Sequence, residues 1–317
     1  MTGKQSGEPL TLMAVHAHPD DECIGTGGVL AKYAAEGART VLVTATRGEE
    51  GEIHDPDLTE EEARPRLAEI REGELRRAVA ILGVGALEFL GYRDSGMMGT
   101  PANEHPDNFH NADRGEAVGR LVRLIRQYRP QVIVTYNVDG GYGHPDHLQT
   151  HRVTWRAFDA AGDPARYPEA GPPWQPSKLY ATAWSREGWQ KMIAELQRRG
   201  LPLPFEDDEP AEQPAEGAPA AAEASTEQSS PERKEDEQEE WGQPDDSITT
   251  FVDVAPYWRA VRDALRAHRT QFAPDSRFLN MPDDLAALSN STEHFVLLRS
   301  RVPTTRPEDD LFQGVRG

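Results

Sequence analysis

Residues 12–22 read LMAVHAHPDDE, and this stretch decides the fold. Its first four residues are apolar, which is typical of a strand buried on both faces of a parallel sheet. Two histidines, a proline and three acids follow where that strand would end. Open α/β sheets bind their ligands beyond the carboxyl ends of parallel strands. The stretch therefore predicts a parallel sheet and marks the sheet edge where a site would lie.

Short apolar runs alternate with helical patterns along the rest of the chain. This alternation predicts an α/β fold, with a Rossmann-like, mostly parallel sheet, helices on both faces, and a smaller C-terminal α/β portion. The strands expected are 12–16, 40–45, 87–90, 132–136, 178–184, 248–254 and 294–299. The helices expected are 24–36, 61–82, 114–128, 145–161, one that ends near residue 196, and 257–271.

Composition changes abruptly in the second half of the chain. Residues 206–246 carry sixteen acids against two bases, or −14 of the formal net charge of −20. So charged and apolar-poor a segment cannot bury enough surface to offset the entropy of ordering it. We therefore expect a Rossmann-like catalytic core over 1–204, an acidic disordered insertion over 205–247, and a strand-helix-strand portion over 248–317 that completes the same domain.

The overall charge and composition exclude several classes of protein. A net charge of −20 argues against nucleic acid and against an anionic membrane surface as partners. No apolar run approaches the roughly 20 residues needed to span a bilayer, and residues 1–10 lack a signal-peptide core, so we expect a cytoplasmic protein. With Cys23 as the single cysteine, a metal here must be held by histidine and carboxylate. The oligomeric state is not readable from the sequence.

A second polar cluster, YNVDGGYGHPDH at residues 136–147, follows the strand expected at 132–136. Each cluster by itself could be a hydrogen-bonded helix cap. Both contain His-Pro-Asp and both follow a sheet strand, so they converge on one sheet edge, which favours a metal site. Two imidazoles, one carboxylate and an open fourth position are typical of hydrolytic zinc, and a further carboxylate can take a proton from water. On this reasoning His147 could pair with His18 or with His151.

These residues resemble the PIG-L or LmbE-like deacetylase family. Its hallmark is an Ala-His-Pro-Asp-Asp run after the first strand and a His-Pro-Asp-His run later, here residues 17–21 and 144–147. The resemblance covers nearly the whole chain outside the acidic insertion. It is closest to the branch that contains the mycothiol-biosynthesis deacetylase and the mycothiol-conjugate amidase, as residues 48–52 and 92–97 also suggest.

The resemblance implies one Zn2+ per chain, although Fe2+ fits the same ligands. The implied site residues are the metal ligands His18, Asp21 and His147, the catalytic residues Asp20, His144, Asp146 and Tyr142, and the sugar-binding residues Arg71 and Asp94.

Each catalytic residue receives a role from its position in the family motif. Asp20 is the implied general base. His144, oriented by Asp146, is implied to stabilise the oxyanion and to protonate the leaving amine, and Tyr142 to polarise the amide carbonyl. Amide hydrolysis needs an activated water, stabilisation of the oxyanion and an acid for a poor leaving group, so these residues supply all three requirements.

The expected reaction is zinc-dependent hydrolysis of an N-acetyl, or similar N-acyl, amide on a glucosamine-containing small molecule. N-acetylglucosaminyl inositol and N-acetylglucosaminyl malate are the substrates expected, within the biosynthesis of low-molecular-weight thiols. An amidase of mycothiol-type S-conjugates and a metal-dependent esterase or phosphoesterase use the same kind of site. An interaction module built on the acidic insertion and a nucleotide-binding Rossmann domain are the rivals from other classes. Leu30 replaces the last glycine of a dinucleotide fingerprint, which counts against the latter.

Overall fold

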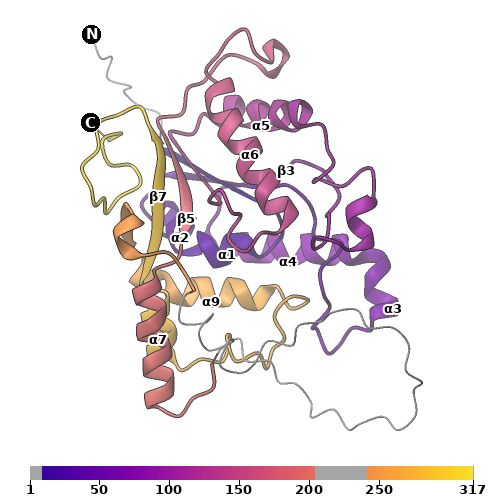
Figure 1. The fold of residues 1–317 in the computed structure, drawn as a ribbon, viewed down its shortest axis with the longest axis vertical. Helices are drawn as coiled ribbons and strands as arrows, with labels where there is room; N and C mark the ends of the chain where they lie inside the picture. The colour runs from indigo at the N-terminus through magenta and orange to yellow at the C-terminus, as the bar shows by residue number, and fades with distance from the viewer. Residues whose placement is uncertain (1–8, 204–240, 317) are drawn as a thin grey trace.

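A computed structural model of the chain describes residues 9–203 and 241–316. It contains a seven-stranded sheet in the order β3-β2-β1-β4-β5-β7-β6 (Figure 1). The strands are β1 (Thr11–His16), β2 (Arg39–Thr44), β3 (Ala86–Phe89), β4 (Val132–Thr135), β5 (Lys178–Ala183), β6 (Thr250–Asp253) and β7 (Thr292–Ser300). The first five are parallel to one another, while β7 runs antiparallel to both β5 and β6. The predicted α/β class and mostly parallel sheet are confirmed.

Helices cover both faces of this sheet. They are α1 (Asp21–Gly25), α2 (Gly27–Ala35), α3 (Glu60–Ala63), α4 (Leu67–Leu82), α5 (Arg114–Tyr128), α6 (Pro145–Ala160), α7 (Arg186–Arg198), α9 (Trp258–Ala267) and α10 (Asp283–Ser289). Successive strand residues point to opposite faces. Met13 and Val15 of β1 therefore pack in one core with α5 and α6, while Leu12 and Ala14 pack in another with α2 and α4. In Figure 1, α5 and α6 lie together on the opposite side from α4 and α9.

The helix expected at 24–36 is two helices, α1 and α2, separated by Thr26. The backbone of this residue is neither helical nor extended (φ −147°, ψ 5°), and its hydroxyl donates to the carbonyl oxygen of Glu22 at 3.0 Å. The same hydroxyl lies 2.9 Å from Nε2 of His16, on β1. The side chain thus competes with the helical backbone for hydrogen bonds, as threonine commonly does, and the helix is interrupted next to the sheet edge.

Two further helices differ from the expectation. The segment expected as a helix at 61–82 contains α3, a 3-10 turn at Arg64–Arg66 and then α4, because Pro65 cannot continue the hydrogen bonds of an α-helix. The helix expected at 257–271 ends at Ala267, since His268 leaves the helical conformation (φ −88°, ψ 58°). Helix α10 was not predicted from the sequence.

The predicted acidic insertion at 205–247 falls mostly on residues 204–240, which lie outside the described residues, so it stays a prediction. Residues 241–247 lie beside the end of β5, through an isolated bridge between Ser185 and Gln243. The strands β6 and β7, from the predicted C-terminal portion, extend the main sheet. Over the described ranges, every helix is too short or too polar to cross a membrane.

Candidate active site

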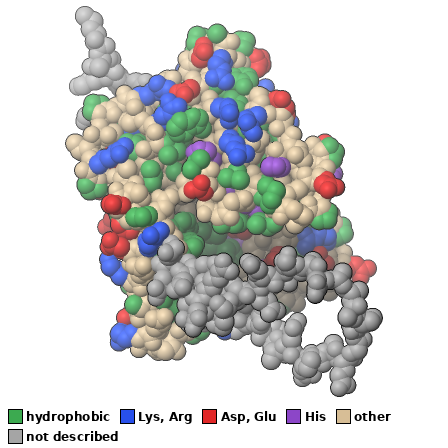
Figure 2. Space-filling view, in the orientation of Figure 1, with side chains coloured by type: hydrophobic (Ala, Val, Ile, Leu, Met, Phe, Trp, Pro, Cys, Tyr) green, Lys and Arg blue, Asp and Glu red, His purple; other side chains and the backbone are tan. Residues whose placement is uncertain are grey.

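The residues singled out in the sequence gather at the carboxyl edge of the parallel strands. They line a cleft of about 970 Å³, which runs from the loops after β2 and β3, past β1 and β4, to the end of β5. Of the nine predicted site residues, eight line this cleft, and Asp146 lies fully buried behind them. Figure 2 shows histidine side chains, in purple, at the surface on the side from which the molecule is viewed. The two sequence clusters therefore do converge on one site.

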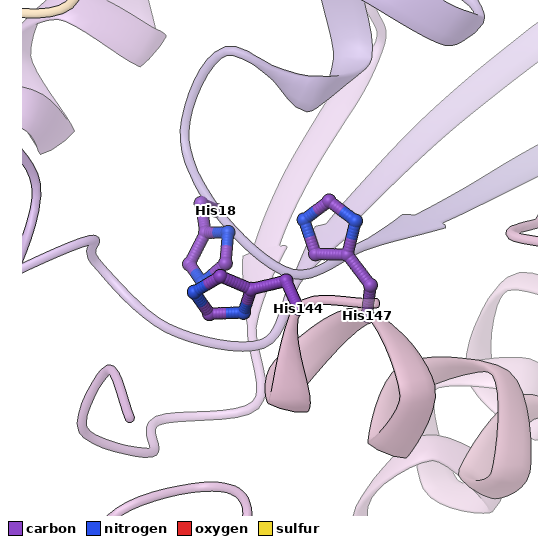
Figure 3. A group of neighbouring side chains, drawn as sticks. All are labelled: His18, His144 and His147. Carbon is purple, nitrogen blue, oxygen red and sulfur yellow. The ribbon is translucent and has the colours of Figure 1, made fainter. Parts of the chain in front are cut away.

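Three histidines face one another at the centre of the cleft (Figure 3). His18 comes from the loop after β1, whereas His144 and His147 come from the start of α6. The ring centroid of His18 lies 4.5 Å from that of His144 and 5.2 Å from that of His147. All three side chains are at least nine-tenths buried. The predicted pairing of His18 with His147 thus has the required proximity.

The carboxylate of Asp21 lies between two of these rings. One oxygen is 3.5 Å from Nδ1 of His18, and the other is 3.4 Å from Nε2 of His147. A tetrahedral zinc with bonds of about 2.0–2.1 Å would separate its ligand atoms by about 3.3 Å. Both distances are close to this separation, one to each oxygen of Asp21, so the carboxylate can share a metal ion with either imidazole.

The protonation of His147 also fits a metal ligand. Its Nδ1 lies 2.9 Å from the carbonyl oxygen of Gly140, which can only accept, so Nδ1 carries the hydrogen and Nε2 carries a lone pair. This buried Nε2 has no hydrogen-bond partner among the described residues. A buried acceptor without a partner is costly. Its position beside Asp21 makes it a ready ligand, with its tautomer fixed from behind.

Two groups that contain His18 have all their ligand atoms within 4.8 Å of one another, His18–His144–His147 and His18–Asp94–Asp146, and neither includes Asp21. In the second group both carboxylates already accept protein donors: Asp94 from the amide of Gly96 at 2.8 Å, and Asp146 from the amide of Ser95 at 2.9 Å. In the first group, Nδ1 of His144 accepts the amide hydrogen of Asp146 at 3.1 Å. Asp21 accepts the amide hydrogen of His18 and the hydroxyl hydrogen of Tyr136 on one oxygen, which leaves its other oxygen, 3.4 Å from Nε2 of His147, as a possible metal ligand.

The electrostatic environment of His18 favours positive charge. Burial alone would lower the pKa of this imidazole, but the carboxylates of Asp94, Asp146 and Asp21 outweigh burial and hold the pKa well above its usual value. Nε2 of His18 lies 3.3 Å from Asp146 and 3.6 Å from Asp94. The negative potential that these acids create would stabilise a bound cation in the same way.

Asp20 lies beside the three residues His18, Asp21 and His147, called the metal set below. Among the described residues it makes no hydrogen bond or ion pair with either histidine of this set. It is one of three residues other than glycine with positive φ among the described residues, at 110°. Glu22 accepts its amide hydrogen at 2.9 Å, and Arg71 donates to its carboxylate at 3.0 Å. Burial raises the pKa of Asp20 to about 7, against the lowering effect of Arg71. A carboxyl group with that pKa is suited to accept a proton at neutral pH.

Arg71 is tied to the protein backbone. Its guanidinium donates to the carbonyl oxygens of Pro19 at 2.6 Å and Gly48 at 2.8 Å, in addition to Asp20. A Cβ atom on Gly48, whose φ is +69°, would lie 2.2 Å from Nη1 of Arg71, so only glycine allows this approach. Arg71 lines the cleft, but most of its donors are used in holding the loop of Asp20. Its Nε has no partner among the described residues.

His144 is held by the backbone of Asp146 and not by its carboxylate. Because Nδ1 accepts the amide hydrogen of Asp146, the neutral ring carries its hydrogen on Nε2. Burial and the neighbouring His18 lower the pKa of His144 to about 4. The carboxylate of Asp146 points the other way, to His18 and to both the amide and the hydroxyl of Ser95. His144 is therefore a neutral hydrogen-bond donor at neutral pH.

Tyr142 is the most exposed of the predicted site residues, with 66% of its surface accessible. It lies on the glycine-rich loop between β4 and α6, where Gly140, Gly141 and Gly143 all have positive φ. Its ring centroid is 5.0 Å from that of His147. Burial by the surrounding cleft, together with Asp21, raises the pKa of the phenol, so the hydroxyl keeps its hydrogen. It can donate to a carbonyl oxygen in the cleft.

Sequence reasoning missed two supports of the site. The hydroxyl of Tyr136 donates to Asp21 at 2.7 Å and accepts the amide hydrogen of Ala17 at 2.8 Å, while its ring stacks on His147. The second support is the buried pair of Glu22 and His268, 2.8 Å apart. The position of Tyr136 directly after a strand was a usable signal. In contrast, His151 lies outside the metal set, with Nδ1 bonded to the carbonyl oxygen of Tyr136.

The chain is also similar to proteins that are already known. The PIG-L family model, described as GlcNAc-PI de-N-acetylase, matches residues 13–158. A 1D-myo-inositol 2-acetamido-2-deoxy-alpha-D-glucopyranoside deacetylase from Thermobifida fusca (strain YX) is 44% identical over 310 residues, which cover 95% of this chain and 98% of that protein. A protein with the same name from Streptomyces scabiei (strain 87.22) is 41% identical, over 100% of this chain and 94% of its own length.

Two solved structures are similar in fold. The N,N'-diacetylchitobiose deacetylase from Pyrococcus horikoshii has a TM-score of 0.57 at 18% identity and covers 91% of this chain and 83% of its own. The 4-carboxy-2-hydroxymuconate hydratase GalB from Pseudomonas putida KT2440 has a TM-score of 0.55 at 18% identity, over 93% and 99%. These two neighbours have different activities, so the fold by itself does not select a reaction.

The fold, the site and the relatives together define the class of protein, an enzyme that hydrolyses amide bonds. The chain belongs to the PIG-L deacetylase family. The predicted family and the predicted type of enzyme are confirmed.

Proposed function

We propose that the chain removes the acetyl group from the nitrogen of N-acetylglucosaminyl inositol, with Zn2+ held by His18, Asp21 and His147. The names of the relatives in Thermobifida fusca and Streptomyces scabiei support this substrate. The observation that carries the proposal is the carboxylate of Asp21, 3.5 Å and 3.4 Å from two imidazole nitrogens, with Asp20 beside it and outside that set. The predicted cytoplasmic location and the small amino-sugar partner belong to the same proposal.

A zinc ion in this set would lower the pKa of a bound water to about 7 and would polarise the amide carbonyl. Asp20 accepts the proton of the attacking water. The hydroxyl of Tyr142 and the Nε2 hydrogen of His144 face the cleft and donate to the carbonyl oxygen as its negative charge develops. The amide C–N bond then breaks, and acetate and the free amine leave.

The departing amine needs a proton. With a pKa of about 7, the carboxyl group of Asp20 can return the proton that it took from water. The family motif implies this role for His144 instead. Because the pKa of His144 is about 4 in this structure, that role requires the pKa to rise as negative charge develops beside the ring.

Asp94 has a place in substrate binding. Its buried carboxylate sits in the wall of the cleft, beside His18 and near Arg71. Charge-assisted hydrogen bonds to hydroxyl groups are strong where water is excluded. We assign to Asp94, with the remaining donors of Arg71, the recognition of sugar hydroxyls next to the acetylated nitrogen.

The test is release of acetate by purified protein, as isolated, after chelation, and after zinc is restored. N-acetylglucosaminyl inositol is compared with N-acetylglucosaminyl malate, with an S-conjugate of mycothiol and with an acetyl ester. We expect release from the inositol glycoside that chelation abolishes and zinc restores. Faster turnover of the S-conjugate or of the ester, with the same metal content, would contradict the proposal.

A further inference from the structure

Two tryptophans at the β5 end of the cleft take no part in the proposed chemistry. Trp184 follows β5 directly, and Trp241 comes from the segment that returns beside it. Their ring centroids are 5.2 Å apart, and they are 37% and 40% exposed. Both line the same cleft as the proposed metal ligands. Aromatic side chains that stay exposed in a cleft offer an apolar ring face to a ligand.

The backbone holds this aromatic pair in place. The amide of Gln243 donates to the carbonyl oxygen of Trp184 at 2.8 Å, and the carbonyl of Gln243 accepts the amide hydrogen of Arg186 at 3.0 Å. The ring of Trp189 supports that of Trp241 from outside the cleft, at 4.9 Å between centroids. The pair is therefore an ordered wall, and its exposed faces are available before a ligand binds.

The aromatic pair lies on one side of the metal set. The two residues assigned to the sugar, Arg71 and Asp94, lie on the other. A Cβ atom built on Gly25 would lie 3.1 Å from Thr182 and 4.0 Å from His16, so Thr182 borders the centre of the site. Trp184 is two residues further along, on the same face as Thr182. The loops with Arg71 and Asp94 adjoin β2 and β3, and the sheet order places β1 and β4 between them and β5.

We propose that Trp184 and Trp241 form a subsite for a second, polyhydroxylated ring that is linked to C1 of the amino sugar. This inference rests on the proposed function. The acetylated nitrogen is on C2, flanked by C3 and C1. Asp94 and Arg71 hold hydroxyl groups, and on an amino sugar these are on the C3 side, because the oxygen on C1 is glycosidic. With C2 at the centre of the cleft, the substituent on C1 points toward the tryptophans.

The chemistry of such a ring suits this wall. A ring with a hydroxyl on each carbon presents C–H groups on its faces, and these pack on the negative face of an indole. Gln243 lines the cleft beside the pair and carries an amide that can bond hydroxyl groups. A cleft of about 970 Å³ is at the upper end of the range for pockets that bind small molecules, and so has room for two rings.

The test compares KM for a two-ring substrate, N-acetylglucosaminyl inositol, with KM for a one-ring substrate, the methyl glycoside of N-acetylglucosamine. The variants are Trp184→Ala, Trp241→Ala and the conservative Trp184→Phe. We expect each alanine variant to lower the preference for two rings by about tenfold, since stacking on an aromatic ring contributes on the order of a tenfold change in affinity or more. Trp184→Phe should restore most of it.

Met98→Ala is the matched control, because Met98 is an exposed apolar residue, 58% accessible, that does not line the cleft. It should leave the ratio of the two KM values unchanged. Equal losses on both substrates in the tryptophan variants would overturn the subsite. So would a loss confined to substrates with a longer acyl group, since the pair would then hold the acyl chain.

A second readout separates this inference from the proposed function. Tryptophan fluorescence is titrated with glucosaminyl inositol and with glucosamine. Quenching by the two-ring compound, weakened in Trp184→Ala, would support the subsite even if wild-type protein released no acetate from either substrate. Equal quenching by both compounds would overturn it, whatever the catalytic activity.

Discussion

The loop after β1 and the loop after β4 both carry a His-Pro-Asp sequence, and both face the same cleft. The first loop is held by two side chains from distant parts of the chain and by one nearby carboxylate. Tyr136 binds the amide of Ala17, Arg71 binds the carbonyl of Pro19, and Glu22 binds the amide of Asp20. These contacts maintain a positive φ at an aspartate, which is a strained conformation.

The second loop is held by hydrogen bonds between its own residues. The amide of Gly140 donates to the carbonyl oxygen of Asn137 at 3.1 Å, and the amide of Gly141 donates to the side chain of the same asparagine at 2.9 Å. Its positive φ values fall on glycines, which adopt them without strain, and its tip carries the exposed Tyr142. On the proposed mechanism, the first loop fixes the position of a base and a metal ligand, and the second presents a donor at the cleft entrance.

The largest effect is expected for Asp20→Asn in the first loop. Asparagine tolerates positive φ, so the backbone should keep its shape while the proton acceptor is lost. We expect kcat to fall by about 10²–10⁴, the usual contribution of a general base. Zinc content, measured by atomic emission, should stay at one per chain.

The control is Asp139→Asn, an exposed aspartate of the second loop that lines the same cleft. Its kcat should stay within about threefold of wild type, because it contacts none of the proposed catalytic groups. Loss of zinc together with activity in Asp20→Asn would instead make Asp20 a metal ligand and remove it as the base.

The next largest effect comes from one substitution, tyrosine to phenylalanine, made at two positions. Tyr136 supports the first loop, and Tyr142 lies on the second. Tyr136→Phe leaves the amide of Ala17 without its acceptor and removes one of the two donors to the carboxylate of Asp21, the other being the amide of His18. It should lower the free energy of unfolding by about 1–3 kcal/mol and weaken zinc binding by about 10–100-fold. Tyr142→Phe should leave both unchanged, since its ring is 66% exposed, and should lower kcat on the order of a hundredfold.

Urea unfolding, zinc titration and acetate release measure these three quantities. If Tyr142→Phe destabilises the fold as much as Tyr136→Phe, the two loops are equally integrated and the contrast between them is wrong.

A smaller effect is expected for Glu22→Gln. The carboxylate accepts from Asp20, His268 and Cys23, and an amide in its place would direct its own donor at one of them. We expect a loss of about 1–3 kcal/mol in unfolding free energy, and a fall in kcat of between about tenfold and a hundredfold through displacement of Asp20. KM should change little.

Glu72→Gln serves as the comparison, because Glu72 pairs at the surface with Arg76 of α4 and with Arg47 of the loop after β2. Its melting temperature and kcat should match those of wild type. A drop in stability with unchanged kcat in Glu22→Gln would show that Glu22 supports the fold but does not position the base.

The difference between a loop held by distant side chains and a loop held by its own residues also explains which features could be predicted from the sequence. Periodicity and the two polar clusters were enough for the parallel strands and for the sheet edge. The convergence of the loops followed from topology, because parallel strands end at one edge. The break at Thr26 was missed, since a side chain that bonds His16 replaces a helical contact, and a helical pattern does not report this.

The supports of the first loop could not be predicted for a different reason. Glu22 and His268 are 246 residues apart in sequence. The aromatic pair at the other end of the cleft was missed for the same reason, since Trp184 and Trp241 meet only because residues 241–247 lie beside the end of β5. Such contacts depend on how distant elements pack, which a single sequence does not encode in any local period. The second loop holds itself, and its glycines and motif were visible in the sequence.

The smallest effect should come from Gly141→Ala in the second loop. Gly141 has φ +80°, and a Cβ atom there would meet nothing within 4 Å, so strain in the backbone is the whole cost. A residue in the left-handed region costs roughly 1–2 kcal/mol, and a loop that holds itself can relieve part of this by local opening. We expect a loss of at most about 1 kcal/mol in unfolding free energy, measured in urea.

Gly48→Ala gives the matching measurement beside the first loop. Its φ is similar, at +69°, but the added Cβ would lie 2.2 Å from Nη1 of Arg71 and force that buried guanidinium away from Pro19 and Asp20. The cost of backbone strain then adds to the cost of the broken hydrogen bonds, so the loss in unfolding free energy should exceed about 2 kcal/mol. We expect kcat to fall as well. Equal losses for the two glycine variants would mean that the backbone angle alone sets the cost, and that Arg71 does not hold the loop of the base.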